Sequence, residues 1–315
     1  MKKYLHKNLL VVGSTGSGRS NFIDKFIISL LQDNNPENLK LLLIDPKKVN
    51  FAQYNGVAHL LSEVISGPEK AKSAFRWAWG ESLRRLKAIE EMGLDTVYEY
   101  KNNNKNFRNK FPEIVIVIEE LADFMVADKK FFENYIRRIT ALSGITGVCV
   151  VVATAKPVTE ILTKKIKSCF WERITFRLPS KDESILAMGE GGAEELHGPG
   201  LCLVKDLIDS TVNKVQMPFI SEEEIVEIIE SIKSKYTDFQ ILMNAKDVAE
   251  EKQEDILYEK AKAIVVKSGK ASSSLLQRRL LIGYSRAARL MDMLEEEGVI
   301  GEANGAEPRE VLIRE

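Results

Sequence analysis

One segment near the start of the chain has the residue types and spacing of a phosphate-binding loop. Its spacing matches the pattern G-x-x-x-x-G-K-[ST] at every position except the lysine. Glycines allow backbone N–H groups to wrap around phosphates, and the helix that follows adds the positive end of its dipole. The segment therefore predicts a nucleotide site made by Gly13, Ser14, Thr15, Gly16, Ser17, Gly18, Arg19 and Ser20.

Arg19 stands where this pattern has lysine. Lysine is a compact point charge, whereas arginine is longer and planar, so the exchange is not conservative at a tight site. We expect weakened binding or misplaced phosphates rather than a complete loss of nucleotide binding. Ser20 keeps the hydroxyl that would bind Mg²⁺.

Two acids, Glu119 and Glu120, directly follow the apolar run Ile114–Ile118. In phosphate-loop proteins the first acid holds Mg²⁺ through water and the next activates the attacking water. The first acid is usually Asp, and Glu119 moves its carboxylate by about one C–C bond, roughly 1.5 Å, at a metal with strict geometry. We predict Ser20 and Glu119 as Mg²⁺ ligands and Glu120 as the catalytic base; the alternative is a charged strand end in solvent.

A block of cations lies near the C-terminus. Residues 260–289 contain four Lys and four Arg without an acid, whereas residues 221–259 and 290–315 carry net charges of -8 and -6. The formal charge of the whole chain is only -1, because the charge of this block is cancelled by the acidic residues elsewhere. Clustered cations indicate nucleic-acid binding, although a solvated helix face or a protein-binding surface is the alternative. The candidate DNA contacts are Lys270, Ser272, Arg278, Arg279, Ser285, Arg286 and Arg289.

Alternating strands and helices must position the phosphate loop and the acid pair. Helical patterns cover Ser20–Gln32, Pro68–Met92 and Phe131–Ser143, with short apolar runs between them. Strands that alternate with helices predict an α/β domain around a mainly parallel sheet. The predicted strands are Leu9–Val12, Lys40–Ile44, Ile114–Ile118, Val148–Ala153, Ile174–Leu178 and Leu201–Val204.

The C-terminal part has a different pattern. Ser221 and Glu224 form a capping box that opens a helix to about Tyr236, and a polar stretch without periodicity follows. Three helices and a terminal hairpin then predict a small winged-helix domain. Its helices are expected at 256–268, 272–280 and 285–297, and its hairpin joins 299–300 to 311–313 around Asn304-Gly305. The predicted organisation is an α/β domain at 1–236, a linker at 237–254 and the winged helix at 255–315.

Composition restricts the class of protein further. The length of 315 residues suggests roughly two domains, and the 44% of residues that are hydrophobic are enough for a sizeable core. The longest apolar runs, such as Val148–Ala153, are too short to cross a bilayer. Three widely spaced cysteines, Cys149, Cys169 and Cys202, fit a reduced protein. We predict a cytoplasmic location, with no membrane segment and no structural metal in this chain.

Taken together, the motifs resemble the motor and γ domains of FtsK/SpoIIIE DNA translocases. The resemblance covers nearly the whole chain except the linker at 237–254. The stretches that carry it are Gly13–Ser20, Leu43–Lys48, Tyr54–Leu61, Val117–Met125, Val152–Pro157, Ile174–Lys181, Gly192–Gly200, Ser268–Leu280 and Gly283–Met291.

This resemblance implies a RecA-like P-loop domain that forms a hexameric ring around duplex DNA. ATP and Mg²⁺ would lie between neighbouring subunits, and hydrolysis would drive translocation during chromosome segregation at cell division or sporulation. The γ winged helix would read short oriented DNA sequences. The membrane segments and the α domain that such proteins have upstream of the motor are expected to be missing from this chain.

Several positions depart from the family pattern. Besides Arg19 and Glu119, Ala155 replaces a sensor Gln, and Thr140–Gly144 replaces a segment with a possible arginine finger. Nearby substitutes for the finger are Arg137, Arg138 and Arg173. At the DNA-reading end, Ser285 replaces a common Asn and Leu281 a usual Arg. Because the changes at Arg19, Glu119, Ala155 and Thr140–Gly144 all affect ATP hydrolysis, we expect weak nucleotide binding and slow or absent hydrolysis.

Three functions remain open from the sequence. The first is a DNA translocase that still assembles on duplex DNA. The second is an ATPase-inactive accessory protein that associates with itself or joins a mixed ring with a full-length homologue. The third is a regulator whose winged helix acts alone. Nucleotide binding separates the third from the others, and hydrolysis separates the first from the second. Asp45 is left with two possible roles, a nucleotide contact or a turn cap.

Overall fold

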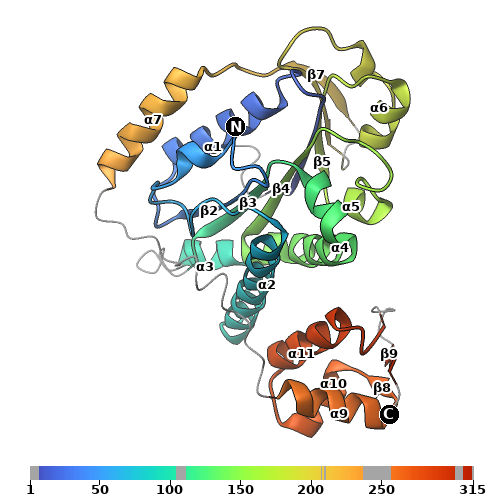
Figure 1. The fold of residues 1–315 in the computed structure, drawn as a ribbon. Coiled ribbons are helices and arrows are strands. Elements are labelled where there is room, and N and C mark those ends of the chain that lie inside the picture. Colours follow the sequence, from blue (N-terminus) through green and yellow to red (C-terminus); the bar gives the residue numbers. More distant parts are fainter. Residues whose placement is uncertain are drawn as a thin grey trace. The chain divides into compact units, whose positions relative to one another are not determined.

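The structure is a computed structural model that describes residues 7–103, 111–206, 208, 211–236, 257–301 and 308–313. The chain forms two compact units, Met1–Ala249 and Glu250–Glu315. Both are drawn in Figure 1. The predicted linker at 237–254 and the predicted turn at Asn304-Gly305 lie outside the described residues.

A seven-stranded sheet forms the centre of the first unit, with the strand order β2-β3-β4-β1-β5-β6-β7. Strands β1 to β5 run parallel, and β6 and β7 continue the sheet antiparallel. The predicted, mainly parallel α/β fold is confirmed. The strands are β1 (Leu9–Val12), β2 (Leu39–Ile44), β3 (Glu113–Ile118), β4 (Val148–Thr154), β5 (Glu172–Phe176), β6 (Leu201–Asp206) and β7 (Val212–Gln216).

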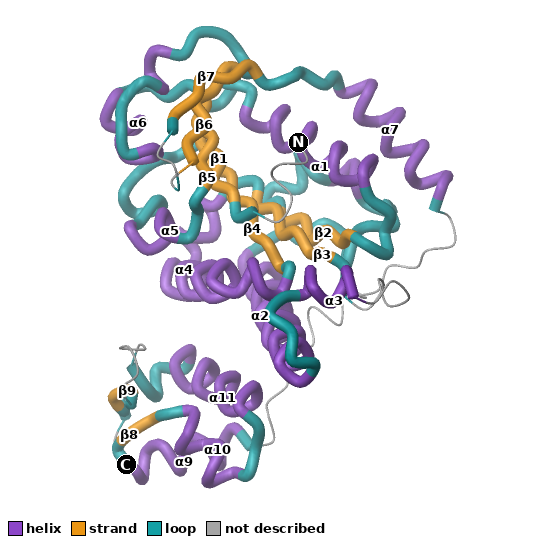
Figure 2. The backbone as a smooth tube through the Cα atoms, turned by 180° about the vertical axis from the view of Figure 1, so that it is seen from behind, coloured by secondary structure: helices purple, strands orange, loops and turns teal. Residues whose placement is uncertain are grey.

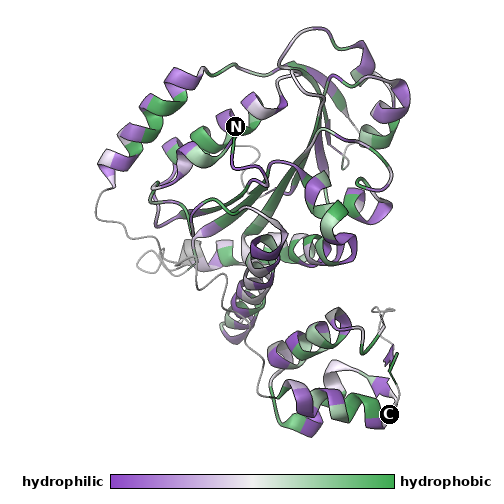
Figure 3. Cartoon of the chain, in the orientation of Figure 1, coloured by the Kyte–Doolittle hydropathy of each residue, from purple (hydrophilic) through white to green (hydrophobic). Residues whose placement is uncertain are grey.

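Helices cover both faces of this sheet, which is why its central strands are almost wholly apolar. Alternate residues of β1 enter two separate cores, with Leu9 in one and Leu10 in the other. Figure 2 shows the sheet between the two helical layers, and Figure 3 shows its hydrophobic strands. One face packs against α1 (Arg19–Asp33) and α7 (Glu222–Lys235). The other packs against α2 (Pro68–Glu91), α4 (Leu121–Thr146), α5 (Lys164–Ser168) and α6 (Lys181–Met188).

Several elements differ from their predicted bounds. Helix α4 starts ten residues before the predicted Phe131, because Glu120 caps it, and it is kinked at Asp128. Strand β5 begins at Glu172, and β7 was not predicted because its residues are mostly polar and partly exposed. A short helix, α3 (Val97–Asn103), follows α2 and was not predicted either. The capping box of Ser221 and Glu224 is present as predicted.

The second unit contains three helices and a small sheet. The helices are α9 (Tyr258–Ser268), α10 (Ser273–Leu280) and α11 (Tyr284–Glu296), which pack around Leu276, Leu290 and Leu294. The predicted contact between residues 299–300 and residues 311–313 is present as a bridge between Ile300 and Val311. The sheet also includes a pairing that was not predicted, β8 (Lys270–Ala271) with β9 (Arg309–Glu310).

Among the described residues, no helix has the length and apolarity that crossing a membrane requires. Cys149, Cys169 and Cys202 are buried free thiols.

Candidate functional site

The loop between β1 and α1 has the backbone of a phosphate cradle. Gly16 and Gly18 adopt left-handed conformations, with φ of 77° and 98°. A Cβ on Gly18 would lie 2.4 Å from the backbone nitrogen of Gly200, and that nitrogen donates to Ser17 O at 2.9 Å. Glycine is therefore required at position 18 both by conformation and by space. The hydroxyl of Ser17 is buried and has no partner among the described residues, so the loop retains an unused polar group.

Arg19 turns back toward the sheet instead of extending into solvent. Its guanidinium lies 3.4 Å from Glu119 Oε1 and 3.5 Å from Glu120 Oε2. It also donates to Gly13 O at 3.4 Å, and its side chain is only 11% exposed. One cation is thus shared between the loop backbone and two carboxylates, all at long hydrogen-bonding distances.

Glu119 directly follows β3 and lies beside Ser20; these are the two residues predicted to hold Mg²⁺. Ser20 Oγ donates to Glu119 Oε1 at 2.9 Å, and Asn50 Nδ2 donates to the same oxygen at 3.0 Å. Glu119 is 3% exposed, which argues against a solvent-facing strand end. Burial raises the pKa of Glu119, and Arg19 opposes that rise. Its second oxygen, Oε2, is buried without a partner among the described residues.

Glu120 accepts hydrogen bonds on both carboxylate oxygens. Oε1 accepts from Thr154 Oγ1 at 2.5 Å and from Ala122 N at 3.2 Å, the latter capping α4. Oε2 accepts from Ala155 N at 2.9 Å and from Arg19. An ionised carboxylate offers about four lone-pair sites, so these donors fill it. If Glu120 is the catalytic base that the sequence predicts, one of these donors would have to leave before it accepts a proton from water.

Asp45 and Asn50 join this site, and the sequence had not assigned Asn50. Asp45 is buried and accepts from the backbone N–H groups of Lys47, Asn50 and Phe51. Of the two roles left open for Asp45, the structure shows the turn cap. That cap places the Asn50 amide against Glu119. An Asp-Pro pair after a strand is a turn signal, but nothing in the sequence marks Asn50.

The three arginines named as substitutes for a finger differ in availability. Arg173 is buried and donates to Ala187 O at 3.2 Å and to Lys167 O at 2.8 Å. Its guanidinium is committed to the interior, so the suggestion that it replaces a finger was wrong. Arg137 is exposed on α4, and Arg138 lies over the Trp79 ring at 5.8 Å.

The candidate DNA contacts lie in the second unit, on β8, α10 and α11. Lys270, Arg278, Arg279 and Arg286 are exposed, whereas Arg289 is half-buried. Ser272 Oγ accepts from Leu275 N at 3.2 Å and caps α10, so its hydroxyl has a local structural role. Ser285 lies in the first turn of α11. Next to these residues, Leu281 is 91% exposed and adopts a left-handed φ of 55°.

Comparison with known families matches both units. The FtsK/SpoIIIE family matches residues 2–159, and the Ftsk gamma domain matches residues 252–314.

Curated relatives agree over most of the chain. The DNA translocase FtsK of Clostridium tetani is 41% identical over 315 residues, covering 97% of this chain and 42% of the relative. The DNA translocase FtsK of Staphylococcus epidermidis is 38% identical over 317 residues, covering 97% of this chain and 40% of the relative. This chain therefore spans about two fifths of the length of these relatives.

Solved structures share the fold over about three quarters of the chain. The pCW3 conjugation coupling protein TcpA, solved as a monomer with ATPγS, superposes with a TM-score of 0.63 at 22% identity, covering 73% of this chain and 66% of that one. The cytoplasmic domain of the type VII secretion ATPase EccC from Thermomonospora curvata gives 0.62 at 21% identity, covering 72% and 28%. With both units matched, the chain belongs to the FtsK/SpoIIIE family and carries its γ winged-helix domain.

Proposed function

We propose that this chain binds ATP and duplex DNA in the manner of an FtsK/SpoIIIE translocase and hydrolyses ATP slowly. The observation that carries the proposal is the position of Arg19 between Glu119 and Glu120. The phosphate loop keeps its backbone form, while its one cation is engaged by both acids. The intact loop backbone therefore favours nucleotide binding, whereas the engagement of Arg19 by both acids slows hydrolysis.

The residues present fit a nucleotide with its metal ion. Backbone N–H groups of residues 13–20 would hold the phosphates, and Ser20 with Glu119 would hold Mg²⁺. Two buried oxygens without partners among the described residues, Ser17 Oγ and Glu119 Oε2, are available for such a ligand. Bound Mg²⁺ would supply charge neutralisation at the phosphates.

Slow hydrolysis follows from the hydrogen bonds that occupy Glu120. It also follows from the replacement of the sensor side chain by Ala155 and from the burial of Arg173. Glu120 must give up a hydrogen bond before it accepts a proton. Ala155 contributes a backbone N–H where a sensor side chain was expected, and Arg173 is unavailable as a finger. The loss of a single transition-state contact typically lowers the rate by about 10²–10³.

The exposed cations of the second unit support binding to duplex DNA. We assign nucleotide binding to residues 1–236, a linker to 237–254 and DNA binding to 255–315. By family membership, we further propose assembly as a hexameric ring, or as a mixed ring with a full-length homologue, in the cytoplasm. Its role would be in chromosome segregation at cell division or sporulation.

A steady-state ATPase assay with duplex DNA tests this proposal, using the wild-type chain and Arg19→Lys side by side. We expect wild-type turnover well below about 10 s⁻¹ per subunit and faster turnover in the variant. Wild-type turnover at or above that value would contradict slow hydrolysis. If Arg19→Lys stays inactive while nucleotide still binds, the accessory role is favoured. If no nucleotide binds, a regulator acting through the winged helix alone remains.

A further inference from the structure

We propose that Asn50 is a positioning residue of the nucleotide site, whose amide holds Glu119 so that one carboxylate oxygen stays open for the metal ion. This assignment rests on the proposed nucleotide-binding function. It adds to the site a residue that belongs neither to the phosphate loop nor to the acid pair.

The donors around Glu119 are distributed unequally between its two oxygens. Oε1 accepts from Ser20 Oγ at 2.9 Å and Asn50 Nδ2 at 3.0 Å, and the Arg19 guanidinium lies 3.4 Å away. Oε2 has no partner among the described residues, although it is buried. An oxygen has two lone pairs, so Oε1 is filled while Oε2 is empty. A buried carboxylate oxygen without a partner is costly, and a cation is the ligand that relieves that cost.

Asn50 reaches Glu119 because its own backbone is fixed. Asp45, directly after β2, accepts from the N–H groups of Asn50 at 2.8 Å and Phe51 at 3.2 Å. Just beyond, Tyr54 is buried and its hydroxyl donates to Asp24 Oδ1 at 2.8 Å. Asp24 lies on α1, one turn after Ser20. The segment from 45 to 54 is therefore attached both to the sheet and to the helix that begins at the phosphate loop.

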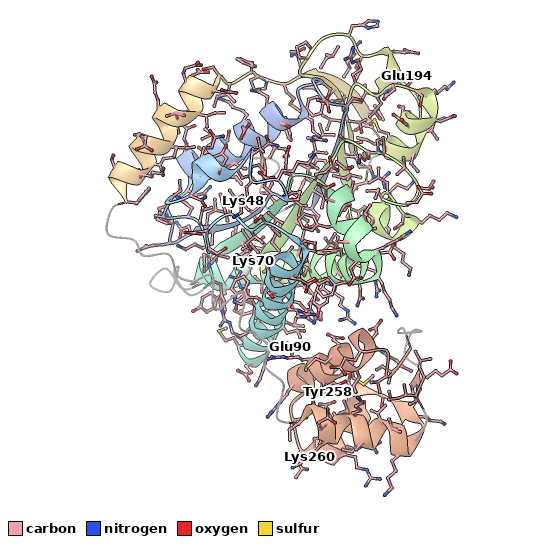
Figure 4. All side chains as sticks on the ribbon, in the orientation of Figure 1. Lys48, Lys70, Glu90, Glu194, Tyr258 and Lys260 are labelled. Atoms are coloured by element: carbon pink, nitrogen blue, oxygen red, sulfur yellow. The ribbon has the colours of Figure 1, made fainter. Side chains whose placement is uncertain are left out.

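Backbone strain lies in the same segment. Lys48, labelled in Figure 4, has a left-handed φ of 55°, which is uncommon for a residue other than glycine. Such conformations persist where the surroundings over-determine them, and they cluster at functional sites. The tight turn between Asp45 and Asn50 brings the amide to the carboxylate. Because the amide donates without adding charge, it can orient Glu119 without competing with a cation as Arg19 does.

A purely structural role for Asn50 makes a different prediction, and Asn55 provides the matched control. Asn55 Oδ1 accepts from Val64 N at 2.8 Å, so Asn55→Ala also removes one side-chain hydrogen bond from this segment. That bond does not involve the phosphate loop or the acids. If Asn50 only stabilises the segment, Asn50→Ala and Asn55→Ala should have similar effects on nucleotide binding.

The test is the affinity of the full chain for a fluorescent non-hydrolysable ATP analogue, measured with Mg²⁺ and again with EDTA. For the wild type and for Asn55→Ala, we expect Mg²⁺ to tighten binding. For Asn50→Ala, we expect at least a fivefold loss of that Mg²⁺-dependent gain, with the affinity in EDTA unchanged within twofold. Should Asn50→Ala fail to fold, Asn50→Ser is used instead, because its side chain is too short to reach Glu119.

Three outcomes would overturn the assignment. The first is a full Mg²⁺-dependent gain in a folded Asn50 variant. The second is an equal loss in Asn55→Ala, which would indicate stabilisation of the segment alone. The third is a wild-type chain that binds the analogue in neither buffer. In that case the proposed nucleotide binding fails and the role of Asn50 fails with it, whereas the first two outcomes leave nucleotide binding intact.

Discussion

Arg19 and the two acids around it set the charge balance of the proposed nucleotide site. A guanidinium has a planar fork, so it can approach two carboxylates at once, which a single ammonium group does less well. The distances of 3.4 and 3.5 Å to Glu119 and Glu120 are long, so each contact is weak. The phosphates of a nucleotide would therefore compete with the acids for the same cation.

Removing one competing acid should tighten nucleotide binding. In Glu120→Gln the neutral amide holds the guanidinium less strongly, which leaves Arg19 freer to meet a phosphate. We expect about a three- to tenfold gain in affinity for ATP in EDTA, on the order of 1 kcal/mol. Isothermal titration calorimetry measures this gain in affinity, with Glu91→Gln at the exposed end of α2 as the control. An unchanged affinity in Glu120→Gln would show that Arg19 does not limit binding.

Asp24 should make stability depend on pH. Burial raises the pKa of Asp24 to about 7 from 3.8, and the hydrogen bond from Tyr54 only partly opposes that rise. Between these values the folded chain keeps a proton that the unfolded chain has lost, so stability falls as the pH rises from about 4 to about 7. Asp24→Asn removes this titration. Its free energy of unfolding relative to wild type should increase over that range by about 2 kcal/mol, after allowing for solvent screening.

Urea unfolding of Asp24→Asn and wild type at pH 5 and pH 8 measures this difference directly. Comparing the variant with the wild type cancels other titrating groups, such as His59, whose pKa burial lowers to about 4. If the difference in free energy of unfolding between Asp24→Asn and wild type is the same at both pH values, the pKa of Asp24 is not raised in the folded chain.

Helix α11 is the element of the second unit that we expect to contact DNA bases. Its buried face carries Ala287, Leu290 and Leu294, and the exposed Arg286 is in its first turn. In helix-turn-helix proteins, base edges are contacted by the N-terminal residues of this helix. Arg286 and Arg289 are three residues apart and so lie near one another on the helix surface.

The double variant Arg286→Ala plus Arg289→Ala should lose several kcal/mol of DNA affinity, on the order of 2–5, mostly from sequence-specific binding. The matched control is Lys260→Ala plus Lys267→Ala, which removes the same charge from exposed positions of α9. Lys260 is labelled in Figure 4. Gel shifts with a selected duplex and a random duplex give both affinities. Equal losses in the two double variants would mean that α11 contributes charge alone.

The elements most visible in the sequence were those with a strong apolar pattern. Strands β1 to β4 are almost wholly buried and consist mainly of Val, Ile and Leu, so the pattern identified them, whereas the polar and partly exposed β7 gave no such signal. The phosphate loop and acid pair were visible as motifs. The contacts of Asn50 and Arg19 with Glu119 were not, because they join residues 69 and 100 positions apart. Only the fold brings such groups together.

At the scale of the whole molecule, charge is distributed unevenly along the chain. The cations of residues 260–289 lie within the second unit, between two acidic stretches. If the second unit binds DNA as proposed, acidic stretches on either side of the cations in the sequence would repel the phosphates, and we expect the exposed cations of β8, α10 and α11 to make the contacts. The first unit carries the proposed nucleotide site and has its own cores. The two proposed activities therefore depend on different parts of the chain.

Salt should weaken DNA binding strongly if the cations of the second unit carry it. Each phosphate neutralised adds about -0.9 to the slope of log K against log salt, so four to seven contacts would give a slope of about -4 to -6. Fluorescence anisotropy with a labelled duplex between 50 and 200 mM salt measures the slope. A chain that ends at residue 249 should lose this salt-dependent binding while it keeps its affinity for ATP. If the shortened chain retains the full slope, the first unit makes the phosphate contacts, and the DNA site has to be assigned there instead.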